Sequence, residues 1–89
     1  MGEPVENSGS DYIKHIVHTM ATALVDDSAS VDIQVVPGEQ VTIYELYVSR
    51  ADRGKVIGKQ GRNADAIRTI MNAAATKSGK RVILEIVEN

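Results

Sequence analysis

The sequence predicts an α+β domain in which a three-stranded sheet carries helices packed on one face, in the order helix, strand, strand, helix, helix, strand. Eighty-nine residues provide for one hydrophobic core and leave no room for a second. Valine and isoleucine together number 20 against three leucines, and this enrichment in β-branched side chains favours a substantial sheet. The spacing of the apolar residues along the chain then separates the helices from the strands.

The chain is expected to begin with a flexible acidic tail over residues 1–10, followed by the domain itself over residues 11–89. Ser10 or Asp11 can cap a first helix, which residues 26–28 (Asp-Asp-Ser) end. The apolar positions of this helix follow an i, i+3, i+4, i+7 pattern. They are Ile13, Ile16, Val17, Met20, Ala21 and Leu24.

Two strands follow and form a predicted antiparallel hairpin. Apolar and polar side chains alternate over residues 31–35, residues 37–40 (Pro-Gly-Glu-Gln) predict a turn, and residues 41–48 are rich in β-branched and aromatic side chains. Tyr44 and Tyr47 point to opposite faces of the second strand, because the side-chain period of a strand is two. At most one of them therefore belongs to the core, and the other is available for an interface.

The second half of the chain predicts two helices and a last strand. Ser49 is expected to open a short helix that ends at the glycines, with Asp52 at the reciprocal position of a capping box. A longer helix is expected over residues 62–77, and Gly79 suits its left-handed C-terminal stop. Residues 80–87 predict a strand that closes the sheet.

The formal net charge of −2 conceals a strong asymmetry along the chain. Residues 1–49 contain eight acidic side chains and one basic one, whereas residues 50–81 contain nine basic side chains and two acidic ones. A local basic cluster of this kind favours contact with the phosphates of a nucleic acid. The alternative on charge alone is a solvated face that binds nothing.

Composition argues against several other classes of protein. The chain has no cysteine and therefore no disulfide, thiol nucleophile or cysteine-ligated zinc. No apolar run approaches the roughly 18 residues of a membrane span, and no secretory signal is recognisable, so a cytoplasmic location is expected. His15 and His18 lie three residues apart without a third ligand nearby, which favours a solvated helix face over a metal site. No arrangement of acids, nucleophile and base predicts an enzyme, and no cofactor is expected.

The most informative segment is Val-Ile-Gly-Lys-Gln-Gly-Arg at residues 56–62. Gly58 and Gly61 let the chain turn tightly between two helices and let a ligand approach the main chain. The following helix directs unpaired N–H groups toward this turn, and Lys59 and Arg62 add positive charge. The arrangement fits the phosphates of a nucleic-acid strand. The alternative is a helix–turn–helix corner that needs glycine for steric reasons alone.

Residues 41–87 resemble the minimal KH motif, strand–helix–helix–strand with a Val-Ile-Gly-x-x-Gly signature. The helix and strand that precede it resemble the type II KH arrangement. Residues 54–62 resemble the corresponding segment of the small bacterial single-KH-domain RNA-binding proteins of the KhpA family. The resemblance to this family covers about residues 12–88. The resemblance implies a cytoplasmic, non-enzymatic protein that grips about four nucleotides of single-stranded RNA, with single-stranded DNA left open. It also implies an RNA chaperone that acts in post-transcriptional regulation of cell wall biogenesis and cell shape, as a homodimer or with a larger KH-containing RNA-binding protein.

Transferred position by position, the resemblance assigns RNA contact to Arg53, Lys55, Val56, Ile57, Gly58, Lys59, Gln60, Gly61, Arg62 and Arg68. Residues 58–61 would form a backbone clamp, the two apolar residues before them would line or support a groove, and the cations would reach phosphates. Ala64 departs from the KH pattern, which has isoleucine or leucine there, and implies a shallower floor beneath the bases. Lys77, Lys80 and Arg81 are expected to serve the helix end and the sheet edge instead.

A single unit of this kind predicts weak binding, about 10⁻⁴ to 10⁻⁶ M, because few phosphates are contacted. Pairing of two units would raise the effective affinity. The hypothesis from another class is a protein-interaction module, in which the KH scaffold serves dimerisation and the basic face binds an acidic protein.

Overall fold

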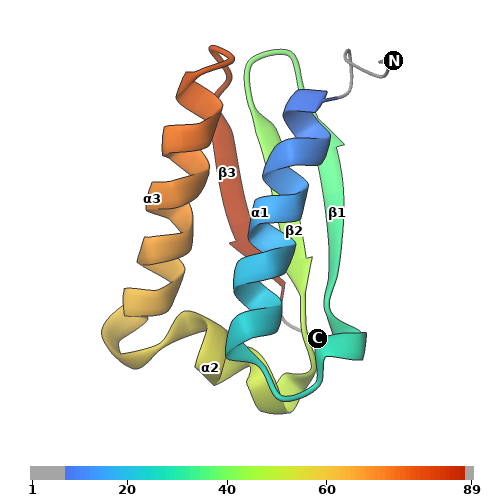
Figure 1. Ribbon diagram of the computed structural model, residues 1–89, viewed down its shortest axis with the longest axis vertical. Helices are drawn as coiled ribbons and strands as arrows, with labels where there is room; N and C mark the ends of the chain where they lie inside the picture. The colour runs from blue at the N-terminus through green and yellow to red at the C-terminus, as the bar shows by residue number, and fades with distance from the viewer. Residues whose placement is uncertain (1–7, 88–89) are drawn as a thin grey trace.

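The computed structural model describes residues 8–87, with side chains from residue 12 onward (Figure 1). Residues 1–7, which make up most of the predicted tail, lie outside the described residues. The helices and strands follow the predicted order: α1 (Ser8–Leu24), β1 (Asp32–Pro37), β2 (Thr42–Tyr47), α2 (Arg53–Ile57), α3 (Arg62–Thr76) and β3 (Val82–Ile86). Single 3₁₀ turns precede β1, α2 and α3: η2 (Ser28–Ser30), η3 (Arg50–Asp52) and η4 (Lys59–Gly61).

The first helix begins at Ser8, so the predicted cap at Ser10 or Asp11 is wrong. Its N-terminal stretch is rich in serine, asparagine and glycine, each of which can cap a helix, and the sequence alone does not select among them. The predicted apolar stripe is confirmed, because Ile13, Val17 and Ala21 are buried.

The sheet has the strand order β1-β2-β3. β1 pairs with β2 in antiparallel register, with Val35 opposite Tyr44, which confirms the hairpin. β2 pairs with β3 in parallel register, with Tyr44 opposite Leu84. β1 extends to Pro37, where the turn was expected, and an edge strand tolerates proline at this position because no neighbour needs its N–H.

The hydrophobic core lies between the sheet and the helices, which cover one face of the sheet (Figure 1). β2 contributes Tyr44 and Leu46, and α3 contributes Ile67 and Met71, all fully buried. Tyr47 is only partly buried and lies on the opposite face of β2. The prediction that the two tyrosines separate to opposite faces is therefore confirmed. Together these residues form a largely aliphatic two-layer core that fixes α2 and α3 against the sheet.

The segment between β2 and α3 differs from the prediction in one respect. The short helix expected from Ser49 is divided into the 3₁₀ turn η3 and the helix α2. At the other end of α3, Gly79 has φ of +72°, which confirms it in a left-handed conformation after the helix. None of the helices within residues 8–87 has the length and apolar character needed to span a membrane.

Candidate nucleic-acid interface

The turn between α2 and α3 has an unusual backbone. Gly58 has φ +80° and ψ 170°, Gln60 has φ +58° and ψ 27°, and Gly61 has φ +76° and ψ 12°. Gln60 is the one non-glycine residue with positive φ among the described residues. The Gly58 N–H donates to the Gly54 carbonyl oxygen at 2.8 Å, and the Gly61 N–H donates to the Gly58 carbonyl oxygen at 3.1 Å. These bonds close α2 and reverse the chain into α3 within four residues, Gly58 to Gly61.

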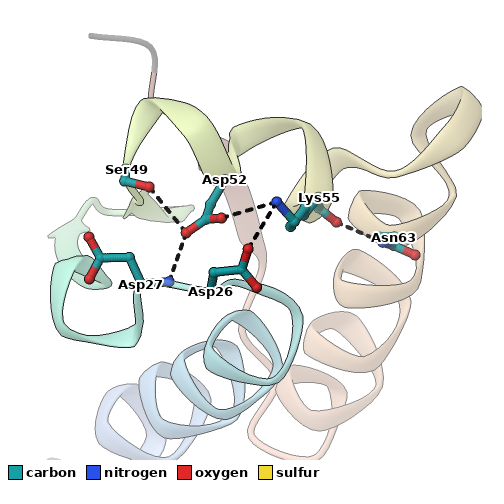
Figure 2. A network of polar contacts seen from close by, with 6 residues as sticks. All are labelled: Asp26, Asp27, Ser49, Asp52, Lys55 and Asn63. Atoms are coloured by element: carbon teal, nitrogen blue, oxygen red, sulfur yellow. Dashed lines mark hydrogen bonds and ion pairs between the residues drawn. The ribbon is translucent and has the colours of Figure 1, made fainter.

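Asn63 holds this turn against α2. Its side-chain Nδ2 donates to the Lys55 carbonyl oxygen at 2.7 Å, across the turn (Figure 2). A Cβ on Gly58 would lie 2.7 Å from Asn63 Cγ and 2.8 Å from the Asn63 backbone nitrogen. Gly58 is therefore required both for its backbone conformation and for this close approach. Asn63 was not among the predicted site residues; its amide can donate hydrogen bonds, but its partner lies eight residues earlier in the chain.

The outer surface of the turn is positively charged and open. Lys59, Gln60 and Arg62 are exposed, and α3 begins at Arg62. The first turn of a 15-residue helix carries N–H groups without intrahelical partners and the positive end of the helix dipole. Lys59 and Arg62 therefore lie beside the N-terminal end of α3, and both side chains are exposed.

A buried carboxylate fixes the base of α2. Asp52 is 2% exposed, and its Oδ2 accepts hydrogen bonds from the Asp27 N–H at 2.9 Å and from the Ser49 hydroxyl at 3.1 Å (Figure 2). The Asp27 N–H, together with the other donors, lowers the pKa of Asp52. The predicted capping box is wrong: the Ser49 side chain makes no cap hydrogen bond to the backbone and donates to the carboxylate instead. Asp52 thereby ties the loop after α1 to the start of α2.

Two of the predicted phosphate ligands, Lys55 and Arg53, have side chains that are ion-paired or half-buried. Lys55 Nζ is 3.3 Å from Asp26 Oδ2 and 3.5 Å from Asp52 Oδ1, and the hydrogen bond with Asp26 is the leading reason why its pKa is raised. Its ammonium group therefore points to the loop after α1 (Figure 2). Arg53 is half-buried, and its Nε and Nη2 are inaccessible and have no hydrogen-bond partner within the described residues.

The apolar residues before the turn contribute unequally. Val56 is fully buried in the core, whereas Ile57 remains partly exposed. Ala64 is also buried, at the start of α3. Of the two predicted groove residues, Ile57 is therefore the one with an accessible side chain.

Arg68 lines a hollow beside the sheet. This hollow, of about 250 Å³, lies between α3 and β3 and is bounded by Arg68, Met71, Asn72, Val82, Ile83 and Leu84. Arg68 follows Ala64 by one helical turn, and its guanidinium lies 3.3 Å from the exposed carboxylate of Asp65. Lys77, Lys80 and Arg81 lie beyond the other end of α3, away from the glycine turn (Figure 1).

His15 and His18 are both exposed on α1. Among the side chains that the structure describes, residues 12–87, no group of three or more histidine, cysteine, aspartate or glutamate residues could hold a metal ion.

The element order αββααβ, with a Gly-x-x-Gly turn between α2 and α3, defines a type II KH domain. Its fold is similar to two solved structures of the protein Era. One is Aquifex aeolicus Era bound to GDP and aluminium fluoride (TM-score 0.60, 20% identity, 97% of this chain and 31% of that one). The other is Era in complex with MgGDPNP and nucleotides 1506–1542 of 16S ribosomal RNA (TM-score 0.56, 21% identity, 83% of this chain and 28% of that one). The chain thus spans about a third of each Era chain.

The family model for the KhpA/KhpB KH domain matches residues 14–86. The RNA-binding protein KhpA of Clostridium acetobutylicum is 52% identical over 75 residues, which are 84% of this chain and 100% of that protein. The RNA-binding protein KhpA of Aquifex aeolicus is 50% identical over 76 residues, 85% of this chain and 96% of that protein. This chain belongs to the KhpA family of KH-domain proteins. This is a family of binding proteins without catalytic function, in agreement with the sequence-based expectation that the chain is not an enzyme.

Proposed function

We propose that this chain binds single-stranded RNA across the turn at residues 58–61 and grips about four nucleotides there. The observation that carries the proposal is the glycine turn with its positive-φ backbone and exposed Lys59 and Arg62, found in a chain whose relatives are named RNA-binding proteins. Phosphates would accept hydrogen bonds from the backbone at the start of α3, and the two cations would neutralise them.

The bases would lie on the side of α3 that faces β3. Arg68 lines the hollow between α3 and β3 there, and Ile57 and Ala64 flank the turn in the sequence. Ala64 has a small side chain, so the floor is shallow and shape selection among the bases is weak. We therefore propose binding with little sequence preference, and with single-stranded DNA as a possible second ligand.

We also propose that the chain acts as a cytoplasmic RNA chaperone in post-transcriptional regulation, with effects on cell wall biogenesis and cell shape. A four-nucleotide site alone has low affinity, about 10⁻⁴ to 10⁻⁶ M. We therefore propose that the chain acts as a homodimer or together with a larger KH-containing RNA-binding protein, because a second linked site raises the avidity.

The helical face offers a surface for this pairing. A largely apolar hollow of about 240 Å³ is bordered by Met20, Ala23 and Leu24 of α1 and by Asn63, Ala66 and Ile67 of α3. Ile70, one turn further along α3, is 46% exposed. Two other exposed aliphatic side chains lie on the acidic sheet face described below, where self-pairing would bring carboxylates together. The helical face is therefore the better surface for a second KH unit.

The RNA proposal is tested by an amide-NMR titration with a short unstructured RNA at two salt concentrations. Shifts are expected from Lys55 to Arg68 and should weaken with salt. Lys59→Asp with Gln60→Asp reverses the charge of the turn on exposed side chains, and aspartate tolerates the left-handed backbone at residue 60. This double variant should keep the fold and lose RNA affinity by at least about tenfold.

The matched control is Lys80→Asp with Gln40→Asp, the same two exchanges at exposed positions beyond the far end of α3. It should keep most of the affinity. If both pairs weaken binding equally, RNA is held by net charge and not by the turn. If the turn amides stay still while a protein partner shifts α1 or the strands, the interaction-module hypothesis is correct instead.

The pairing proposal is tested separately by Ile70→Glu. Sedimentation velocity of the native chain, alone and with a KH-containing partner, should show a concentration-dependent larger species that this variant lacks. Ile83→Glu, on the sheet, is the control for the chain alone and should leave its self-associated species intact. Equal sedimentation of the native chain and the Ile70 variant would exclude the helical face as the pairing surface.

A further inference from the structure

The face of the sheet opposite the helices carries two adjoining rows of side chains with different chemistry. The first row is apolar: Val36, Ile43 and Ile83 lie side by side on β1, β2 and β3. Val36 is 43% exposed and Ile83 is 49% exposed. Such a row across all strands of a sheet is more than an isolated surface aliphatic residue.

The second row is acidic. Gln34, Glu45 and Glu85 lie opposite one another on the three strands, two residues along from the apolar row. Asp32 lies opposite Tyr47, two residues further along each strand of the hairpin. Within residues 12–87, none of the three carboxylates of this face forms an ion pair. The pKa of Tyr47 is raised mainly by burial and next by the nearby charge of Glu45, and the charges of Glu85 and Asp32 raise it further.

The surface is also hollowed. Asp32, Gln34, Val36, Glu45 and Tyr47 border a shallow depression of about 530 Å³. The side chains that point to this face from the three strands include no lysine and no arginine. The basic side chains of the chain are concentrated instead in residues 50–81, which include the glycine turn.

We propose that this sheet face is a docking surface for a cationic segment of another protein, one in which arginine or lysine adjoins an aliphatic side chain. The two rows are about 7 Å apart, which is the distance between alternate residues of a strand. A segment with that spacing places an aliphatic side chain on Val36, Ile43 and Ile83 and its cations on the carboxylates. Tyr47 adds an aromatic ring suited to a guanidinium.

Charge argues against other occupants of this face. RNA phosphates are repelled by the unpaired carboxylates, so a nucleic acid does not compete for the surface. A second copy that paired through the same face would bring Glu45 and Glu85 against their own counterparts, which is unfavourable. A cationic protein segment therefore fits this face, and it leaves the turn at residues 58–61 free for its own ligand.

The test is an amide-NMR titration of the full chain, at low salt, with an acetylated and amidated peptide of the repeat Arg-Ser-Val-Ser, in which arginine and valine alternate along one face of the extended chain. Shifts are expected on Asp32 to Val36, on Thr42 to Tyr47 and on Val82 to Ile86. Glu45→Gln with Glu85→Gln should weaken binding by about tenfold, because each carboxylate contributes one Coulombic contact. Glutamine at residue 45 still accepts the hydrogen bond that the Tyr47 hydroxyl donates there.

The matched control is Glu39→Gln with Asp65→Gln, which removes the same number of charges from exposed positions off this face. It should change the affinity by less than about twofold. Equal weakening by both pairs, or shifts confined to the helices, would overturn the proposal. A self-association of the native chain that Glu45→Gln with Glu85→Gln abolishes would also overturn it, because the occupant would then be a second copy docked through its basic surface.

Discussion

Gly58→Ala tests whether the turn depends on the conformation of Gly58. The backbone of Gly58, at φ +80° and ψ 170°, lies in a region that glycine alone readily adopts, and a side chain there costs about 1–3 kcal/mol. The new methyl group would also lie 2.7 Å from Asn63 Cγ. If Asn63 moves away, its hydrogen bond to the Lys55 carbonyl oxygen is lost, at about 0.5–1.5 kcal/mol. Together these effects lower the free energy of unfolding by about 1.5–4.5 kcal/mol.

Urea denaturation followed by circular dichroism measures this loss, provided that the denaturant dependence stays constant. Gly61→Ala is the control, because its φ of +76° lies in the ordinary left-handed region and a Cβ there meets nothing within 4 Å. It should cost about 1–2 kcal/mol. Asn63→Ala gives the contribution of the hydrogen bond alone, about 1 kcal/mol. Equal losses in the two glycine variants would refute the reasoning, since the contact with Asn63 would then carry no energy.

Two further predictions concern charged residues in α2, just before it and in the turn, namely Asp52, Lys55 and Lys59. The pKa of Asp52 is lower in the folded chain than its ordinary value of 3.8, so its ionised form stabilises the fold above that value, and this contribution disappears as the pH falls through the lower folded pKa. Asp52→Asn should therefore be less stable than the native chain near neutral pH, and the urea midpoints of the two should converge on acidification; a constant difference down to acidic pH would contradict the assignment. Lys59→Gln should reduce RNA affinity about three- to fivefold. Lys55→Gln should reduce it less, because Lys55 is ion-paired with Asp26 and Asp52. Fluorescence anisotropy with a labelled RNA measures both affinities, and an equal loss in the two variants would place Lys55 in the RNA site.

The order of elements and the position of the turn were predictable because they depend on local patterns. Alternation of apolar residues set the hairpin, helical spacing set the buried faces of α1 and α3, and two glycines marked the reversal between helices. These signals lie within a few residues of one another. The conformation of Gly58 and Gly61 follows from the same local chemistry.

The contacts that Asp52 and Lys55 make with the loop after α1 were not predictable, because these partners are distant in the chain. Asp52 accepts a hydrogen bond from the N–H of Asp27, 25 residues earlier, so it serves as a tie between two segments and not as a cap. Lys55 matches the basic pattern around the turn, yet it pairs with Asp26. A charge pattern shows how much charge a segment carries, but the fold decides which charges remain available to a ligand.

This distinction sets the expected salt dependence of RNA binding. Five cations surround the turn in the sequence, Arg53, Lys55, Lys59, Arg62 and Arg68, and contact by all five predicts a slope of log K against log salt of about −3.5 for a single strand. Lys55 and Arg68 are ion-paired and Arg53 is half-buried, which leaves Lys59 and Arg62 and a slope of about −1.4. Anisotropy titrations over a range of salt concentrations measure this slope. A slope near −3.5 would mean that RNA displaces Asp26 and Asp65 from Lys55 and Arg68. A slope near −1.4 would mean that each unit contacts few phosphates and binds weakly, so that its affinity depends on pairing with another unit.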